Sequence, residues 1–155
     1  MTTRENHLAP PARSRAASLT GLSRPSYAMA ILLLVQYGLG IGVNLFVTLP
    51  RQDHRAGLGA VISNGPAAVS MHAVLGLALV VTALAIAIRA VATRHGGIIA
   101  LAVLGLLALG SAAFNGISFA RTGQNEASFS MALGWAVALL CYLSIVYIAG
   151  RPAQR

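Results

Sequence analysis

Residues 67–88 read AAVSMHAVLGLALVVTALAIAI, a run of 22 positions with no Asp, Glu, Lys or Arg. A helix of this length, at about 1.5 Å per residue, spans roughly 33 Å and crosses a hydrocarbon core about 30 Å thick. The apolar residues do not alternate with polar ones, as they would in a strand of a membrane barrel. The run therefore predicts a membrane-spanning helix.

Three more apolar runs of similar length occur in the chain, at residues 27–49, 98–119 and 129–149. Hydrophobic residues make up 57% of the 155 residues and charged residues only 9%, whereas a soluble domain carries roughly 25% charge. The sequence therefore predicts an all-α protein, a four-helix transmembrane bundle with up-down-up-down order. The membrane domain is expected over residues 27–149, between tails at 1–26 and 150–155.

The segment before the first run is polar and basic, and it is rich in Pro, Ser and Thr. Such a composition buries too little apolar surface to fold alone, so residues 1–26 are expected to form a disordered tail. The first run has 23 residues, which is longer than the core of about 7–15 residues in a signal peptide. It is interpreted as a membrane span.

The distribution of arginine predicts how the chain crosses the membrane. All 11 basic residues are Arg. Eight of them fall in residues 1–26, 89–97 and 150–155, and three fall in residues 50–66 and 120–128. Since basic loops stay in the cytoplasm, both termini are expected inside. The loop at 50–65 then faces outward, and a role as a lid or as a plain connector stays open.

The net charge of +8 does not indicate a nucleic-acid partner, because the arginines are scattered between apolar runs instead of clustering on one face of a soluble domain. The expected partner is the lipid bilayer, with self-association or another membrane protein as further possibilities. The single cysteine, Cys141, excludes a disulfide within the chain and any motif built on several cysteines.

Small and hydrogen-bonding residues recur at helical spacing in the four runs, and membrane helices use such residues to contact one another. Gln36, Gly40 and Asn44 are four residues apart in the first run, as are His72 and Gly76 in the second. The pattern predicts one compact bundle in which these stripes face inward. The glycines expected at helix contacts are Gly40, Gly76 and Gly134.

Four polar side chains on these stripes fall within roughly 10 Å of the outer boundary when residues are counted along helices. They are Asn44, His72, Asn115 and Ser130, and Gln36 lies deeper. His72 is the one side chain within the runs that gains charge near neutral pH, and such residues in a membrane are functional candidates. The hypothesis is an outward-facing polar pocket centred on His72 that binds a small or quinone-like ligand. The alternative is a His72 that only links helices by a hydrogen bond.

Several functions stay open at this point. The protein is a candidate quinone or haem protein, although no second histidine lies within a run to face His72 as an axial ligand. It is also a candidate accessory or assembly subunit of a larger membrane complex. No carboxylate lies in a run, and no catalytic triad, metal-spaced cluster or phosphate loop occurs, so an enzyme is the less favoured class.

Four short motifs carry a resemblance: residues 44–50 (NLFVTLP), Met71-His72, Leu75-Gly76 and 114–116 (FNG). With the four runs, they resemble small four-span integral membrane proteins of bacteria that have no assigned activity. The resemblance covers the spans and not the N-terminal tail. It implies a multi-pass protein of the bacterial cell membrane and implies no activity, ligand or cofactor.

Overall fold

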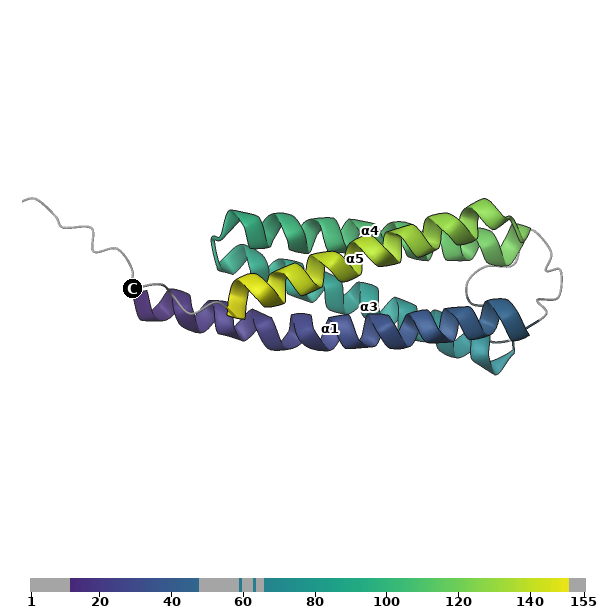
Figure 1. The fold of residues 1–155 in the computed structure, drawn as a ribbon, viewed down its shortest axis with the longest axis horizontal. Coiled ribbons are helices and arrows are strands. Elements are labelled where there is room, and N and C mark those ends of the chain that lie inside the picture. Colours follow the sequence, from purple (N-terminus) through teal and green to yellow (C-terminus); the bar gives the residue numbers. More distant parts are fainter. Residues whose placement is uncertain (1–11, 48–58, 60–62, 64–65, 151–155) are drawn as a thin grey trace, which may run out of the picture.

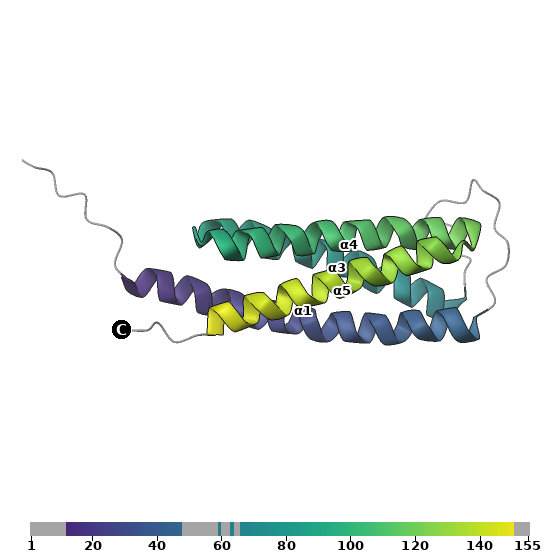
Figure 2. The same cartoon turned by 45° about the horizontal axis from the view of Figure 1, so that its top comes forward.

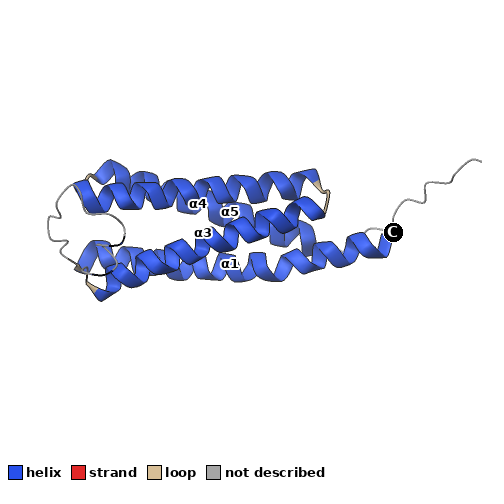
Figure 3. Cartoon of the chain, turned by 180° about the vertical axis from the view of Figure 1, so that it is seen from behind, coloured by secondary structure: helices blue, strands red, loops and turns tan. Residues whose placement is uncertain are grey.

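The computed structural model describes residues 12–47, 59, 63 and 66–150. Four long helices make up this part of the chain, and no strand occurs in it (Figures 1 and 3). They are α1 (Ala12–Phe46), α3 (Ala67–Ala92), α4 (Gly96–Thr122) and α5 (Asn125–Gly150). Each is long and apolar enough to cross a membrane. The prediction of an all-α protein with four apolar helices at these places is confirmed.

Helix α1 begins earlier than the sequence pattern predicts. Residues 12–26 were expected to belong to a disordered tail, but they are helical. The last part of this segment is anchored by packing, since Leu22 is 2% exposed and Ser26 is fully buried. The composition argument missed this because it treated the segment in isolation from the bundle. Residues 1–11 and 151–155, and most of the loop considered as a lid, lie outside the described residues.

Pro25 lies inside α1 and has no N–H to donate to the carbonyl of Gly21 one turn earlier. Arg89 of α3 supplies a replacement donor, because its Nη2 lies 3.4 Å from the Gly21 oxygen. The guanidinium therefore satisfies a carbonyl that the proline leaves without its helical partner. This contact ties the start of the apolar part of α1 to the end of α3.

Short turns reverse the chain between α3 and α4 and between α4 and α5. Thr93 ends α3 with its hydroxyl donating to the Ala90 carbonyl at 2.7 Å. His95 caps α4, since its Nδ1 accepts from the Ile98 N–H at 3.4 Å. Gly123 follows α4 with φ of 66°, a left-handed conformation that glycine adopts without strain. Successive helices therefore run in opposite directions (Figure 1).

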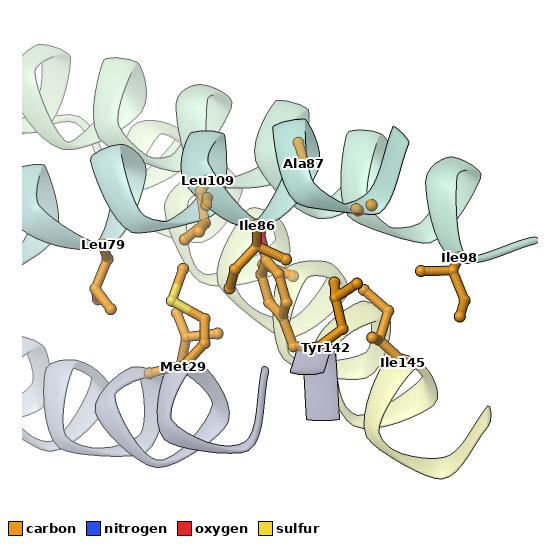
Figure 4. Packing of buried hydrophobic residues seen from close by; sticks show 14 residues of the cluster. Met29, Leu79, Ile86, Ala87, Ile98, Leu109, Tyr142 and Ile145 are labelled. Carbon is orange, nitrogen blue, oxygen red and sulfur yellow. The ribbon is translucent and has the colours of Figure 1, made fainter. Parts of the chain in front are cut away.

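The four helices pack as a ring in which α1 contacts α3 and α5, and α4 contacts the same two helices. Buried apolar side chains concentrate in one half of the bundle, here called the closed half: α1 residues 22–33, α3 residues 79–90, α4 residues 98–109 and α5 residues 138–149. Figure 4 shows Met29, Leu79, Ile86, Tyr142 and Ile145 converging there from three helices. This half holds the bundle together.

The other half, called the open half, comprises α1 residues 34–46, α3 residues 67–78, α4 residues 110–122 and α5 residues 125–137. Here the pair α1 and α3 separates from the pair α4 and α5, as both Figures 1 and 2 show. A cavity lies between the two pairs in this half.

The outer surface of the bundle is apolar along its length. Large side chains on every helix are more than half exposed, among them Leu45, Ile88, Leu107 and Leu140. A soluble monomer rarely exposes contiguous apolar area on this scale. In a bilayer these side chains face lipid at no cost. The surface is thus compatible with an integral membrane protein.

Candidate functional site

A cavity of about 660 Å³ occupies the open half of the bundle, and all four helices line it. Most of its wall is made of apolar side chains. The lining side chains that carry a polar or charged group come from every helix: Gln36, Tyr37 and Asn44 of α1, His72 of α3, Arg121 of α4, and Ser128 and Trp135 of α5. The cavity is therefore a candidate site for a ligand.

Gln36 and His72 form the polar contact between α1 and α3 at this cavity. The Gln36 Nε2 donates to the His72 backbone carbonyl at 2.9 Å and lies 3.4 Å from His72 Nε2. An amide nitrogen carries two hydrogens and accepts none, so Nε2 of a neutral imidazole must be the acceptor. The proton of His72 then resides on Nδ1. Gln36 therefore fixes the tautomer of the histidine.

Each of these two side chains lies over a glycine of the opposite helix. A Cβ at Gly40 would come within 3.0 Å of His72 Cε1, and a Cβ at Gly76 within 3.0 Å of Gln36 Nε2. On each helix the polar residue precedes the glycine by four positions. Because α1 and α3 run in opposite directions, the polar residue of each helix lies beside the glycine of the other. The arrangement is a reciprocal lock, named here the Gln36–His72 lock, in which each glycine makes room for the partner's polar group.

Two atoms of the lock have no hydrogen-bond partner among the described residues. They are the Gln36 Oε1 and the His72 Nδ1, and both are enclosed. Leaving a buried polar group unsatisfied costs about 1–3 kcal/mol. One acceptor and one donor at the wall of the cavity thus lack partners.

Trp135 fixes α5 against α1 on the same wall. Its indole N–H donates to the Leu33 carbonyl at 2.7 Å. Its ring stacks on that of Tyr37 with centroids 4.3 Å apart and an angle of 19° between the planes. Both aromatic rings line the cavity. No sequence signal points to this contact, because a hydrogen bond to a backbone carbonyl of another helix leaves no motif.

The structure brings together part of the predicted pocket. Gln36, Asn44 and His72 line the cavity, whereas Asn115 and Ser130 do not. Asn115 instead donates from Nδ2 to the Ser111 carbonyl at 2.8 Å, one turn back on its own helix, and Ser130 is exposed. Hence the partner of His72 is Gln36 of the neighbouring helix. Asn115 and Ser130 therefore lie outside the lining of this cavity.

Gly134 makes the tightest helix contact of the three glycines named from the sequence. A Cβ at this position would lie 2.7 Å from the backbone oxygen of Ala108 and 3.2 Å from the Cβ of Ala112. A flexible side chain could move away from such a Cβ, but the backbone of α4 could not without shifting the helix. In contrast to Gly40 and Gly76, which face side chains, Gly134 therefore lets two backbones meet and holds α4 and α5 together along the cavity.

Within the described residues no group of three or more His, Cys, Asp or Glu side chains could hold a metal ion. His95, the other histidine in this part of the chain, caps the first turn of α4, whereas the cavity lining on α4 begins at Leu109. No family model, curated protein or solved structure matches the chain. The class of protein therefore follows from the helices alone: four helices long and apolar enough to cross a membrane are compatible with a multi-pass integral membrane protein.

Proposed function

We propose that this protein binds one small lipid-soluble molecule, of the size and kind of a quinone, in the cavity between its two helix pairs. The observation that carries the proposal is the cavity of about 660 Å³ with a mainly apolar wall and the Gln36–His72 lock on one side. Ligand sites typically have volumes of about 300–1,000 Å³, apolar walls and a few convergent polar groups. The open half meets each of these criteria.

The lock provides the groups that would orient such a ligand. His72 Nδ1–H is a donor and Gln36 Oε1 is an acceptor, and neither has a partner among the described residues. The terminal torsions of these side chains have broad wells, so a ligand that replaces the hydrogen bonds of the lock with its own could reach either group from the cavity. A ligand with a carbonyl or hydroxyl group would then give these atoms a hydrogen bond that they do not make with the described residues. The Tyr37 and Trp135 rings offer a flat apolar surface beside it.

The proposed orientation places the closed half toward the cytoplasm. Arg24 lies near residue 22 of α1 and Arg89 in the last turn of α3, both at that end, and Arg121 lies in the last turn of α4 at the other end. Because basic segments remain in the cytoplasm, the cavity would lie at the depth of the outer leaflet. A bacterial cell membrane and a ligand that reaches the site from the outer leaflet are both parts of this proposal.

The single tryptophan makes the proposal testable by fluorescence. Trp135 is the only Trp in the chain and it lines the cavity. A short-tailed benzoquinone, added to the purified protein in nonionic detergent, should quench its emission with a saturable dependence on concentration. Ala113→Phe, which narrows the cavity from α4, should remove the saturable component.

Ala100→Phe is the matched control, because Ala100 is an exposed alanine of the same helix that lies in the closed half, away from the cavity. This variant should bind the quinone as the wild type does. Linear quenching of equal slope in all three proteins would show random collision within the micelle and would overturn the proposal of a quinone-like ligand.

A further inference from the structure

The geometry of the Gln36–His72 lock determines which of its atoms accept a hydrogen bond and which donate one. The backbone carbonyl of His72 only accepts, so the amide atom 2.9 Å from it must be the Gln36 nitrogen. The other branch of the amide is then Oε1, which only accepts. Because the same nitrogen lies 3.4 Å from His72 Nε2, the imidazole proton resides on Nδ1. The two atoms without a partner among the described residues are thus one acceptor, Oε1, and one donor, Nδ1–H.

Both atoms belong to side chains of the cavity wall. Gln36 and His72 line the cavity, and so do the glycines that they face. A Cβ at Gly40 would lie 3.6 Å from His72 Nδ1, and a Cβ at Gly76 would lie 3.0 Å from Gln36 Nε2. Since a glycine has no side chain, the residue opposite each polar group offers it no side-chain hydrogen bond. The cavity is the side from which a ligand approaches the lock.

Ligand head groups differ in how they match one acceptor and one donor. A carbonyl group, as in a quinone or a ketone, accepts but does not donate. It pairs with His72 Nδ1–H and leaves Gln36 Oε1 without a donor. A hydroxyl group both donates and accepts, so its chemistry matches both atoms. A hydroxyl ligand therefore forms a hydrogen bond that a carbonyl ligand cannot, with an acceptor that is otherwise buried without a donor among the described residues.

This match does not depend on the long contact between the two side chains. The 3.4 Å separation of Gln36 Nε2 and His72 Nε2 exceeds the usual range of about 2.7–3.2 Å for an N–H donor, so a ligand replaces this contact most readily. Its replacement frees a second acceptor, His72 Nε2. The lock then offers two acceptors in place of one, and a ligand without a donor hydrogen satisfies neither.

We infer that the cavity prefers ligands with a hydroxyl head, of the quinol or phenol class, to the quinone or ketone of the same skeleton. This inference rests on the proposed function and narrows its ligand class to molecules that carry a donor hydrogen. One hydrogen bond separates the two classes, so the dissociation constants should differ about tenfold. The carbonyl compound still binds, because both classes contact the same apolar wall and the Tyr37 and Trp135 rings.

The test compares an alcohol and a ketone of the same carbon skeleton. A short-tailed benzoquinone is bound to the purified protein in nonionic detergent, with quenching of Trp135 as the signal. A propyl-substituted cyclohexanol or the corresponding cyclohexanone is then added, and recovery of the emission reports displacement of the benzoquinone. Each concentration is corrected for partition into protein-free micelles. The alcohol should displace the benzoquinone at about one tenth of the ketone concentration.

Variants then assign the preference to the lock. The double variant Gln36→Met with His72→Phe removes every side-chain donor and acceptor of the lock and keeps side chains of similar size. It should bind the alcohol and the ketone with equal affinity. Asn115→Leu is the matched control, because it removes a polar side chain of the open half that bonds to its own helix and does not line the cavity. This variant should keep the tenfold ratio. Circular dichroism checks that both variants are helical, and the ratio in the wild type tests the inference without any variant.

The failures can be told apart. If the benzoquinone does not quench saturably, the proposed function falls, and the inference falls with it. If the benzoquinone binds but the alcohol and the ketone displace it equally, or neither displaces it, quinone binding stands and the preference for a hydroxyl head is overturned. A tenfold ratio that persists in the folded double variant, or that disappears in Asn115→Leu, would assign the preference to other groups and would also overturn the inference.

Discussion

Replacing Gly134 by alanine tests the packing of α4 against α5 most directly. The added Cβ would lie 2.7 Å from the Ala108 carbonyl oxygen and 3.3 Å from the Ala112 nitrogen. Both atoms belong to the backbone of α4, so the contact is relieved only if the two helices move apart. Overpacking of this kind costs typically about 1–3 kcal/mol. The helix also gains up to about 1 kcal/mol, because alanine has a higher helix propensity than glycine.

The sum predicts that Gly134→Ala lowers the free energy of unfolding by up to about 2 kcal/mol. Gly110→Ala separates the two contributions. Gly110 lies within α4, and a Cβ there would meet nothing within 4 Å, so this variant keeps the propensity gain without the clash. It should be at least as stable as the wild type. The difference between the two variants, about 1–3 kcal/mol, then measures the backbone contact alone.

The single cysteine provides the assay. Cys141 is 4% exposed and lies in the closed half, so a thiol-reactive dye labels it only as the bundle opens. Thermal unfolding in nonionic detergent should therefore show labelling at a lower temperature for Gly134→Ala than for Gly110→Ala. If the two variants unfold at the same temperature, the α4–α5 interface tolerates a methyl group at this point, and the close approach of the two backbones is refuted.

Three further predictions concern the contacts of α1 and the orientation of the chain. Arg89→Gln should destabilise the bundle by about 1 kcal/mol in unfolding measurements, and by less in a Pro25→Ala background, because the restored N–H then satisfies the Gly21 carbonyl. An equal cost in both backgrounds would contradict this account. Trp135→Phe should retain ring stacking but lose the hydrogen bond to α1, lowering stability by about 0.5–1.5 kcal/mol; an unchanged midpoint would speak against that bond. A reporter fused after Gly150 should read as cytoplasmic, and a periplasmic signal would reverse the proposed orientation.

The helices could be predicted from the sequence because hydropathy and length alone decide whether a segment crosses a membrane. The apolar windows at residues 67–88, 98–119 and 129–149 all lie within helices that extend a few residues beyond them. Polar and glycine residues at the ends continue the helical backbone without belonging to the apolar run. The larger discrepancy is at α1, where packing of Leu22 and Ser26 lengthens the helix into a segment that composition alone assigned to a disordered tail.

The candidate site could be predicted in part, and the reason lies in how polar side chains behave in lipid. The prediction from helical spacing assumed that each polar residue forms a hydrogen bond with a residue of another helix. Gln36 and His72 follow that assumption. Asn115 does not, since it bonds to the carbonyl one turn back, as Thr82 and Ser144 also do. A polar side chain that is satisfied on its own helix can face any direction, so spacing alone could not separate the two groups.

The position of the Gln36–His72 lock explains how the bundle keeps a cavity without losing its fold. The closed half supplies the buried apolar contacts, and the lock extends the contact between α1 and α3 beyond it. Gly134 does the same for α4 and α5. Contacts within each pair therefore hold that pair together along the open half. Trp135 joins the two pairs by its hydrogen bond to Leu33, at the end of the cavity nearest the closed half. A ligand of the proposed kind, lying beyond Trp135, would contact two walls that are each held by their own helix contacts, and it would displace no buried apolar side chain of the closed half.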